Sequence, residues 1–279
     1  FSRMYTASLA YTSGSARAAE TVRDGAPLAF NIAGGLHHAH RTRASGFCVF
    51  NDAAVALAIL RERFERVAYV DIDVHHGDEI GRDHGDGVQG LFLDDPTVLT
   101  CSIHEDPRTL FPGTGFLEET GSAFTSVNAP VPAGATGEAW LAAFDGMVMA
   151  ALERYRPQAI VLQMGTDAHE LDPLAHLRVT AQEWREAVVR VRDFGVPIVA
   201  VGGGGYNLLT VPRMWVGACL ELAGLAVPER LPEDLAEAWQ TPRFDDLHLP
   251  APRGAGMREV GDLVGRFQTE ILPRIPAAA

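Results

Sequence analysis

Residues 69–78 read YVDIDVHHGD, an apolar run that carries polar residues at alternate positions and then breaks at a glycine. The pattern predicts a buried strand that leads into Asp73 and His75. Because these residues are two positions apart, an extended chain points both side chains to one face. A carboxylate and an imidazole supply two of the three protein ligands of a catalytic zinc site, which keeps one position for water.

A second apolar run offers the third ligand. Residues 159–167 read AIVLQMGTD and end in Asp167 in the same way. One such pair of acids also fits two N-caps of following helices, which is a purely structural alternative.

Further apolar runs predict the fold class. Strands are expected at 28–32, 67–73, 98–103, 159–164 and 197–201. Helices are expected at 13–24, 52–64, 136–155, 180–193 and 211–222, with a short helix within 228–252 and a closing helix at 256–272. This alternation predicts an α/β fold, a mostly parallel sheet with helices on both faces.

Polar residues gather directly after each predicted strand. In chain order they are His37-His38, Asp73 to Asp78, Ser102 to His104, Asp167 and Tyr206. Ligands of parallel sheets bind at the C-terminal ends of the strands. Five strands that load one edge with polar groups therefore favour an active site over the helix-cap alternative.

Composition limits the classes of function. The chain has 279 residues, enough for one large domain, and a net charge of −13 that disfavours nucleic-acid binding. No apolar run reaches the ~20 residues that span a bilayer, and no signal peptide is recognised. Three widely spaced cysteines imply no disulfide framework and favour a reducing compartment, so a cytoplasmic location is expected. The oligomeric state cannot be predicted.

Two adjacent histidines and two spare acids suggest proton transfer. His37 and His38 could be ordinary loop histidines, but Asp71 and Asp78 stand beside the expected ligands. A carboxylate that binds one ring nitrogen fixes the tautomer, so the other nitrogen can move protons. Two such pairs would provide a general base for water and a general acid for a leaving amine.

A strand that runs into four glycines precedes Tyr206. Residues 201–206 read VGGGGY, and the rival interpretation is a phosphate-binding loop. No Lys-Ser/Thr pair follows, and the spacing differs from that of dinucleotide sites. Four glycines allow a sharp turn that brings the phenol of Tyr206 to the expected metal as an oxyanion donor.

Two glycine-containing loops each carry an aromatic residue. Residues 46–48 read GFC and residues 111–115 read FPGTG. Either loop alone fits ordinary packing. Together, Phe47 and Phe111 could form two walls of a narrow apolar tube that holds a linear alkyl chain.

Six ordered motifs carry a family resemblance. They are GGLHHA, ASGFCVFNDAAVA, VDIDVHHGD, SIHEDPRTLFPGTG, GTDAHELDPL and GGGGY. The set resembles the zinc-dependent histone deacetylase superfamily, and within it the bacterial acetoin-utilisation deacetylases and acetylpolyamine amidohydrolases. It runs from about Phe30 to about Leu220. The resemblance implies the arginase/deacetylase fold, with residues 1–279 as a single domain.

The resemblance also implies the activity and the metal ligands. It implies an amidohydrolase that removes an acetyl group from a lysine side chain or similar amine and releases acetate. Zn²⁺ would be bound by Asp73, His75 and Asp167, although Fe²⁺ can occupy such sites.

The same resemblance implies the residues that act on the reacting groups. His37 and His38 would move protons, with Asp71 and Asp78 as their partners, in an order that the sequence does not decide. Tyr206 would stabilise the oxyanion.

Further roles implied by the resemblance concern the substrate and a second ion. Phe47 and Phe111 would form the tunnel walls, Gly46 and Gly204 would contact the substrate, and Leu174 would line the rim. A structural K⁺ would be bound by Asp71, Asp73, His75, Ser102 and Ile103, partly through backbone oxygens.

The chain departs from the family pattern in residues 79–86. They read EIGRDHGD, echo the preceding HHGD and resemble an eight-residue insertion. Either Asp78 or Asp86 could therefore back His38, and Asp78 keeps the family spacing. The insertion could be a lengthened loop without catalytic effect or a remodelled tunnel mouth. It could also be a weak metal site from Asp83, His84 and Asp86.

A second departure is the start of the chain. The resemblance implies a strand-and-loop segment before Phe1, with an acidic residue that grips the substrate. Its loss would reduce substrate affinity and expose a sheet edge.

Other functions and substrates remain as alternatives. Arginase-like binuclear manganese hydrolases need an acid where this chain has Gly77, which favours a single metal. A non-catalytic acetyl-lysine or metal-binding module is an alternative of another class. Acetylated polyamines and small metabolites are alternative substrates, but Leu174 provides no acidic gatekeeper, which favours acetyl-lysine in proteins.

Overall fold

Six parallel strands form the sheet around which the described part of the chain is built. The computed structural model describes residues 2–77, 87–247 and 254–278. The strand order is β1-β6-β5-β2-β3-β4, and every neighbouring pair is parallel. The strands are β1 Leu28–Asn31, β2 Val67–Asp71, β3 Val98–Glu105, β4 Ser126–Val131, β5 Ala159–Gln163 and β6 Ile198–Val201.

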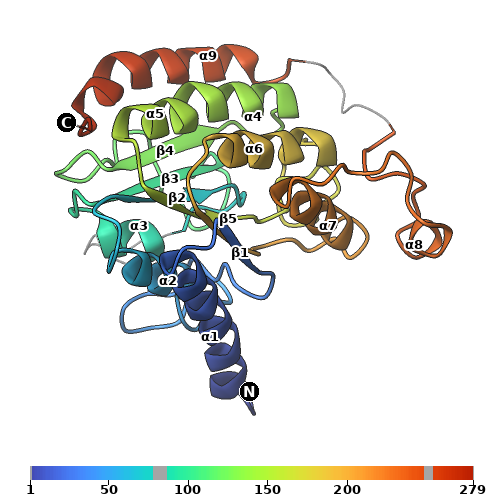
Figure 1. Ribbon diagram of the computed structural model, residues 1–279. Coiled ribbons are helices and arrows are strands. Elements are labelled where there is room, and N and C mark those ends of the chain that lie inside the picture. Colours follow the sequence, from blue (N-terminus) through green and yellow to red (C-terminus); the bar gives the residue numbers. More distant parts are fainter. Residues whose placement is uncertain (1, 78–86, 248–253, 279) are drawn as a thin grey trace.

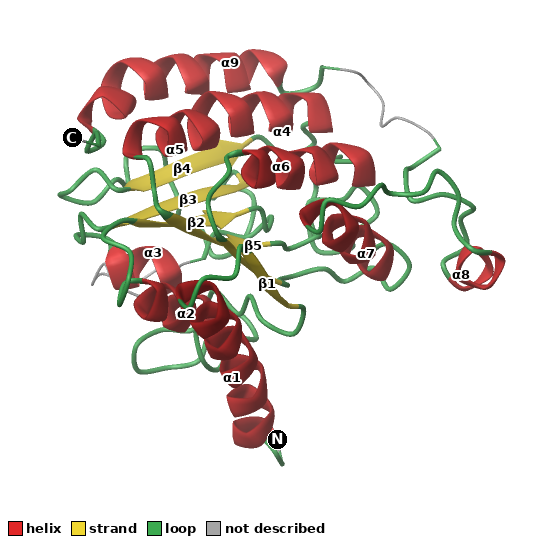
Figure 2. Cartoon of the chain, in the orientation of Figure 1, coloured by secondary structure: helices red, strands yellow, loops and turns green. Residues whose placement is uncertain are grey.

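Helices cover both faces of this sheet (Figures 1 and 2). One face is covered by α1 Met4–Arg23, α2 Asp52–Leu60 and α3 Gly87–Phe92. The other is covered by α4 Gly137–Ala143, the π-helical η1 Phe144–Met149, α5 Ala150–Tyr155, α6 Ala181–Asp193 and α7 Val211–Leu222. Helix α9 Met257–Arg266 packs on the outer side of α4. Shorter elements are α8 Glu233–Ala238, η2 Phe267–Ile271 and η3 Leu272–Arg274. Within the described ranges, no helix is long and apolar enough to cross a membrane.

Alternating residues of the strands build one hydrophobic core on each face. On β2, Ala68 and Val70 belong to the larger core under α4 to α7, while Val67 and Tyr69 belong to the smaller core under α1 and α2. This division follows from the period of two in a strand. Each fully buried valine or leucine contributes about 1.5–3 kcal/mol relative to an exposed one, which accounts for the continuous apolar runs in the sequence.

The strand order creates a crevice beside β2. The chain passes from β2 outward to β3 and β4, and then returns to place β5 on the opposite side of β2. Loops after β2 and β5 therefore lead away in opposite directions. In open α/β sheets ligands bind outside the C-terminal strand ends at such a reversal. The residues that follow β2 and β5 lie at this position.

Most predicted elements are confirmed, but several bounds differ, helix α2 ends at Leu60 rather than residue 64, and helix α3 was not predicted. The expected helix at 13–24 begins at Met4, and the helix at 136–155 contains the π-helical segment η1. Strand β2 ends at Asp71, two residues earlier than expected. Strand β4 was not predicted, because its sequence SVNAPV has no apolar run. The proposed insertion at 79–86 lies outside the described residues.

The start of α6 provides a test of local stability. Thr180 and Glu183 form a capping box, in which the Thr180 hydroxyl accepts from the Glu183 backbone and the Glu183 carboxylate accepts from the Thr180 backbone. Thr180→Ala should lower the free energy of unfolding in urea by about 1 kcal/mol. The matched control is Thr136→Ala, because buried Thr136 begins α4 without a side-chain cap bond. Equal losses in both variants would contradict the capping role.

Candidate metal centre and active site

Two acids and one histidine meet at the crevice between β2 and β5. Potential ligand atoms of Asp73, His75 and Asp167 all lie within 4.8 Å of one another, and all three residues are buried. Asp73 and His75 follow β2, and Asp167 follows β5. Because β2 and β5 pair with Asp71 opposite Gln163, both chains leave the sheet at the same level. The structure thus brings the three predicted metal ligands together.

Backbone and amide donors hold the two carboxylates in place. Asp73 Oδ2 accepts hydrogen bonds from the Gln163 side-chain amide at 2.8 Å and from the Gly204 backbone N–H at 2.7 Å. Asp167 Oδ1 accepts from the Val74 backbone N–H at 2.8 Å. The opposite carboxylate oxygens remain directed at His75. The donors therefore orient the acids before any ion binds.

The charges of the trio favour a cation among them. His75 Nδ1 lies 3.0 Å from Asp167 Oδ2 and 3.3 Å from Asp73 Oδ1. Burial alone lowers the pKa of His75, but its hydrogen bonds to Asp167 and Asp73 raise that pKa to about 10. Burial and the charge of Asp73 raise the pKa of Asp167 to about 7. A positive charge, either a proton on His75 or a metal ion, is therefore strongly favoured here.

Nitrogen and oxygen donors of this kind fit a divalent ion. Zinc binds imidazole nitrogen and carboxylate oxygen, and catalytic sites use three protein ligands. The three donors lie close enough to share one ion. Gly77, two positions after His75, offers no side-chain ligand for a second ion.

The predicted histidine pair lies beside the trio. His37 Nδ1 lies 2.7 Å from Asp71 Oδ2, and His37 Nε2 lies 3.1 Å from His38 Nε2. Burial lowers the pKa of His37, but the charges of Asp71 and Asp73 outweigh burial and raise it to about 9. Asp78, the predicted partner of His38, lies outside the described residues. The structure thus places one of the two expected histidine–aspartate pairs.

The loop that carries these histidines is anchored from α2. Asn51 donates its side-chain amide to the carbonyls of His37 and Ala39, while its oxygen caps α2. Asp52 accepts from the backbone N–H groups of Gly35 and Leu36. Loop and helix therefore form one hydrogen-bonded unit, which fixes where the imidazoles point.

Tyr206 stands at the opening of the site. Its ring centroid lies 6.4 Å from that of His75, in an edge-on arrangement. Its backbone N–H donates to Asp172 Oδ2 at 2.7 Å. Burial and the charges of Asp73 and Asp167 raise the pKa of Tyr206, so the phenol keeps its proton and can act as a donor.

At two positions, only glycine lets the backbone pack directly against a side chain of the site. A Cβ at Gly204 would lie 2.2 Å from Asp167 Oδ2, so any larger residue would displace a predicted ligand. Gly46 has a positive φ of 47°, and a Cβ there would lie 2.3 Å from the His38 ring. Backbone therefore packs directly against the reactive groups at both places.

A cavity of about 260 Å³ connects these groups. Its lining includes Asp73, His75, both histidines of the pair, Gly46, Phe47, Gly204 and Tyr206. Phe47 is 83% exposed and its ring centroid lies 6.3 Å from that of Tyr206. The cavity joins Asp73 and His75 of the trio to the surface, while Asp167 is not part of its lining.

The other two predicted substrate contacts lie outside this lining, as far as the described residues show. Phe111 is half-exposed, and its ring centroid lies 5.2 Å from that of His38 and 6.5 Å from that of His75. Leu174 is partly exposed, and its backbone N–H donates to Asp172 Oδ1 at 3.0 Å. Both are therefore near neighbours of site residues.

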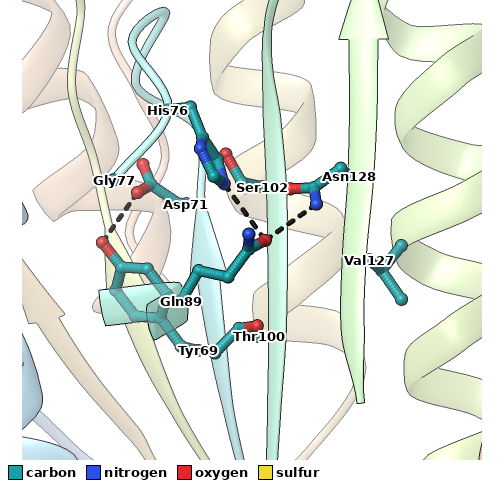
Figure 3. A pocket seen from close by; sticks show the side chains of 9 residues that line it. All are labelled: Tyr69, Asp71, His76, Gly77, Gln89, Thr100, Ser102, Val127 and Asn128. Carbon is teal, nitrogen blue, oxygen red and sulfur yellow. Dashed lines mark hydrogen bonds between the residues drawn. The ribbon is translucent and has the colours of Figure 1, made fainter. Parts of the chain in front are cut away.

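The residues predicted to bind potassium surround the ends of β2 and β3. Asp71 and Ser102 are register partners, and Ile103 follows on β3. Asp71 and Ser102 also line a separate cavity of about 10 Å³ (Figure 3). The Ser102 hydroxyl lies 2.8 Å from His104 Nδ1.

Sequence reasoning missed two residues that shape the site. The side-chain amide of Gln163 donates a hydrogen bond to Asp73. In the sequence, the only sign of this role is that Gln163 is a lone amide at the end of an otherwise apolar strand. Asp172 binds the backbone of both Leu174 and Tyr206, and its signal was an acid before proline in a loop already singled out. Which backbone each side chain reaches depends on contacts between distant segments.

Comparison with known proteins finds a matching family model and relatives of similar sequence. The family model described as "Histone deacetylase domain" matches residues 1–222. The acetoin utilization protein AcuC of Bacillus subtilis is 37% identical over 276 residues, covering 91% of this chain and 69% of that protein. Histone deacetylase clr6 of Schizosaccharomyces pombe is 39% identical over 223 residues, covering 78% of this chain and 53% of that protein. The chain thus spans about half the length of this eukaryotic relative.

Two solved structures are also similar. A histone deacetylase homolog from Aquifex aeolicus has a TM-score of 0.80 and 32% identity over 95% of this chain and 73% of that one. A histone deacetylase homolog complexed with SAHA has a TM-score of 0.84 and 31% identity, with the same coverage of both chains.

The charges of the trio predict how metal affinity depends on pH. An ion binds the neutral imidazole and ionised carboxylates, so it must displace the proton that His75, with a pKa of about 10, holds at lower pH. Zinc affinity should therefore rise by about one log unit per pH unit between pH 7 and 8. The rise should be steeper below pH 7, where Asp167, with a pKa of about 7, also binds a proton.

Competition with a chelator at several pH values measures this dependence. His176→Ala is the matched control, because His176 is an exposed histidine that pairs with Glu105 outside the trio. It should keep the slope, while His75→Ala should lose tight binding. An affinity that does not change with pH would contradict this electrostatic account.

Proposed function

The chain belongs to the histone deacetylase family, and we propose that Asp73, His75 and Asp167 bind the catalytic ion of a metal-dependent deacetylase. The reaction is hydrolysis of an acetyl amide into acetate and a free amine. One observation carries the proposal. Three ligand atoms within 4.8 Å of one another belong to a site whose cavity also exposes the histidine pair and Tyr206.

Zinc is the ion that this donor set favours, with Fe²⁺ as the alternative. When bound, such an ion supplies Lewis-acid chemistry, because it polarises a carbonyl oxygen and makes water more acidic. The buried carboxylates would neutralise its charge. This assignment rests on the nature and proximity of the donors.

Protons are moved by the histidine pair in this proposal. One of His37 and His38 takes a proton from the attacking water, and one gives a proton to the departing amine nitrogen. Asp71 keeps His37 oriented through the 2.7 Å contact with its Nδ1. Asp78 is the proposed partner of His38.

Charge on the carbonyl oxygen is stabilised by Tyr206. Its pKa is raised, so its hydroxyl remains a donor while negative charge develops on that oxygen. The Gly46 carbonyl would accept the N–H of the substrate amide. Gly204 allows the substrate to approach, because it has no side chain.

The proposed substrate is an acetylated lysine side chain of a protein. Phe47, which is close to Tyr206, and Phe111, which is close to His38, would contact its methylene groups, and Leu174 would line the rim. The apolar Leu174 gives no attraction to the second charge of an acetylated polyamine. Acetylated polyamines and small metabolites are therefore alternative substrates with a weaker basis.

Three further proposals concern a second ion, the extent of the domain and the cellular setting. A structural K⁺ would be bound by Asp71, Asp73, His75, Ser102 and Ile103, with Asp71 and Ser102 paired in register. Residues 1–279 would form one deacetylase domain. A reducing, cytoplasmic setting is proposed from the odd number of cysteines.

Removal of the Tyr206 hydroxyl tests the proposal. Wild-type protein loaded with zinc should release the lysine amine from a fluorogenic acetyl-lysine peptide. Tyr206→Phe should lower kcat by about 10²–10³-fold, the usual loss when one oxyanion donor is removed. Acetylspermidine, assayed in parallel, should be turned over less efficiently than the peptide.

The control variant is Tyr5→Phe, which changes an exposed tyrosine outside the cavity and should keep full activity. Zinc binding without turnover of either substrate would contradict the deacetylase proposal and favour a binding module. Full activity in Tyr206→Phe would contradict the role given to that phenol.

A further inference from the structure

A buried phenol contacts the aspartate behind the histidine pair. Tyr69 lies on β2 two residues before Asp71, is 2% exposed, and donates its hydroxyl to Asp71 Oδ2 at 2.8 Å. We propose that Tyr69 is a positioning residue that holds the Asp71 carboxylate and thereby fixes the orientation of His37, with a proton on its Nδ1. The kinetic part of this inference rests on the proposed function.

The placement of Tyr69 follows from the strand. Residues two apart on β2 point to the same face, so the Tyr69 ring lies below Asp71 and its hydroxyl reaches up to the carboxylate. Figure 3 shows this contact. The ring itself is packed in the smaller core under α1 and α2. An aromatic side chain with few rotatable bonds, held by a packed core, presents its hydroxyl at a fixed point.

Three donors determine the state of Asp71. Oδ2 is contacted by the Tyr69 hydroxyl and, at 2.7 Å, by His37 Nδ1, while Oδ1 accepts from the Asp73 backbone N–H at 3.1 Å. An ionised carboxylate can only accept hydrogen bonds. His37 Nδ1 must therefore carry its proton, and His37 Nε2 is the ring nitrogen that faces His38. The hydrogen bond from the Tyr69 hydroxyl keeps the Asp71 carboxylate from rotating away from His37.

A small cavity beside Asp71 gives the carboxylate room to rotate unless the Tyr69 hydroxyl holds it. The cavity of about 10 Å³ is lined by Asp71, Ser102, Asn128 and other residues, and Asn128 Oδ1 is buried without a partner there. It is just large enough for about one water molecule. Without the Tyr69 hydroxyl, Asp71 Oδ2 could rotate toward this space or exchange its contact with His37 for one with water.

Tyr155 offers a matched comparison. It is also fully buried, and its hydroxyl also donates to one oxygen, the Pro96 carbonyl at 3.0 Å, but on α5 and away from the site. Tyr69→Phe and Tyr155→Phe each remove one buried hydroxyl and keep the ring. Any effect that only Tyr69→Phe causes therefore reports on Asp71 and His37.

The first test reads the imidazole directly and needs no catalysis. In protein labelled with ¹⁵N-histidine, wild type should show a protonated Nδ1 with a strongly low-field proton, assigned by its loss in His37→Asn. In Tyr69→Phe this signal should shift or broaden through exchange with water, and in Tyr155→Phe it should stay in place. A signal that is absent from wild type, or unmoved in Tyr69→Phe, would overturn the proposal.

The second test separates positioning from stability. With zinc bound, Tyr69→Phe should lower kcat by about tenfold or more, as loss of an outer hydrogen-bond partner commonly does. Its KM should stay within about twofold of wild type, because Tyr69 is buried and is not among the residues that line the cavity beside the trio. Tyr155→Phe should lower Tm by a similar amount and keep kcat.

Equal kcat values in the two variants would overturn the positioning role. A wild-type protein without turnover would instead reject the proposed deacetylase function, and the NMR comparison would still decide the role of Tyr69. The two failures are therefore distinguishable.

Discussion

Two buried carboxylates that point at one imidazole are the constraint on which the site depends. Asp73 and Asp167 are almost completely removed from water, where an isolated charge is very unfavourable. Their repulsion must be balanced by donors and by a cation, and the surrounding chain supplies the donors. Strand β5 must lie next to β2 for this balance, because Gln163 and Val74 each reach the carboxylate that follows the neighbouring strand.

Packing behind the site keeps this arrangement rigid. The indole N–H of Trp184 donates to the Gly165 carbonyl at 2.8 Å, and that of Trp215 donates to the Met164 carbonyl at 2.7 Å. Both carbonyls belong to the turn that leads from β5 to Asp167. Helices α6 and α7 therefore do more than cover the sheet, since their tryptophans fix the backbone that presents a metal ligand.

The sequence was informative where chemistry and periodicity coincide. Apolar runs located five of the six described strands, and polar residues after them located Asp73, His75 and Asp167. Strand β4 was not predicted, because Asn128 and Pro130 interrupt the apolar pattern, although the residues of this strand are mostly buried. The first part of α1 was not predicted, because it contains serine, threonine and glycine, which are weak helix formers.

Contacts between distant segments could not be derived from the sequence. The Asp172 carboxylate bridges two loops, and Gln163 reaches across to another strand, so both depend on the neighbour order of the sheet. That order, with β5 beside β2, is a property of the whole fold. Periodicity predicts which residues face inward, but it does not predict which partner they meet there.

Anomalous diffraction from crystals of the zinc-loaded protein would test the central claim most directly. The account predicts one strong zinc peak within about 2.0–2.2 Å of one atom each from Asp73, His75 and Asp167. A principal peak outside this trio, or two ions of equal occupancy within it, would contradict the single-metal site on which the account is built.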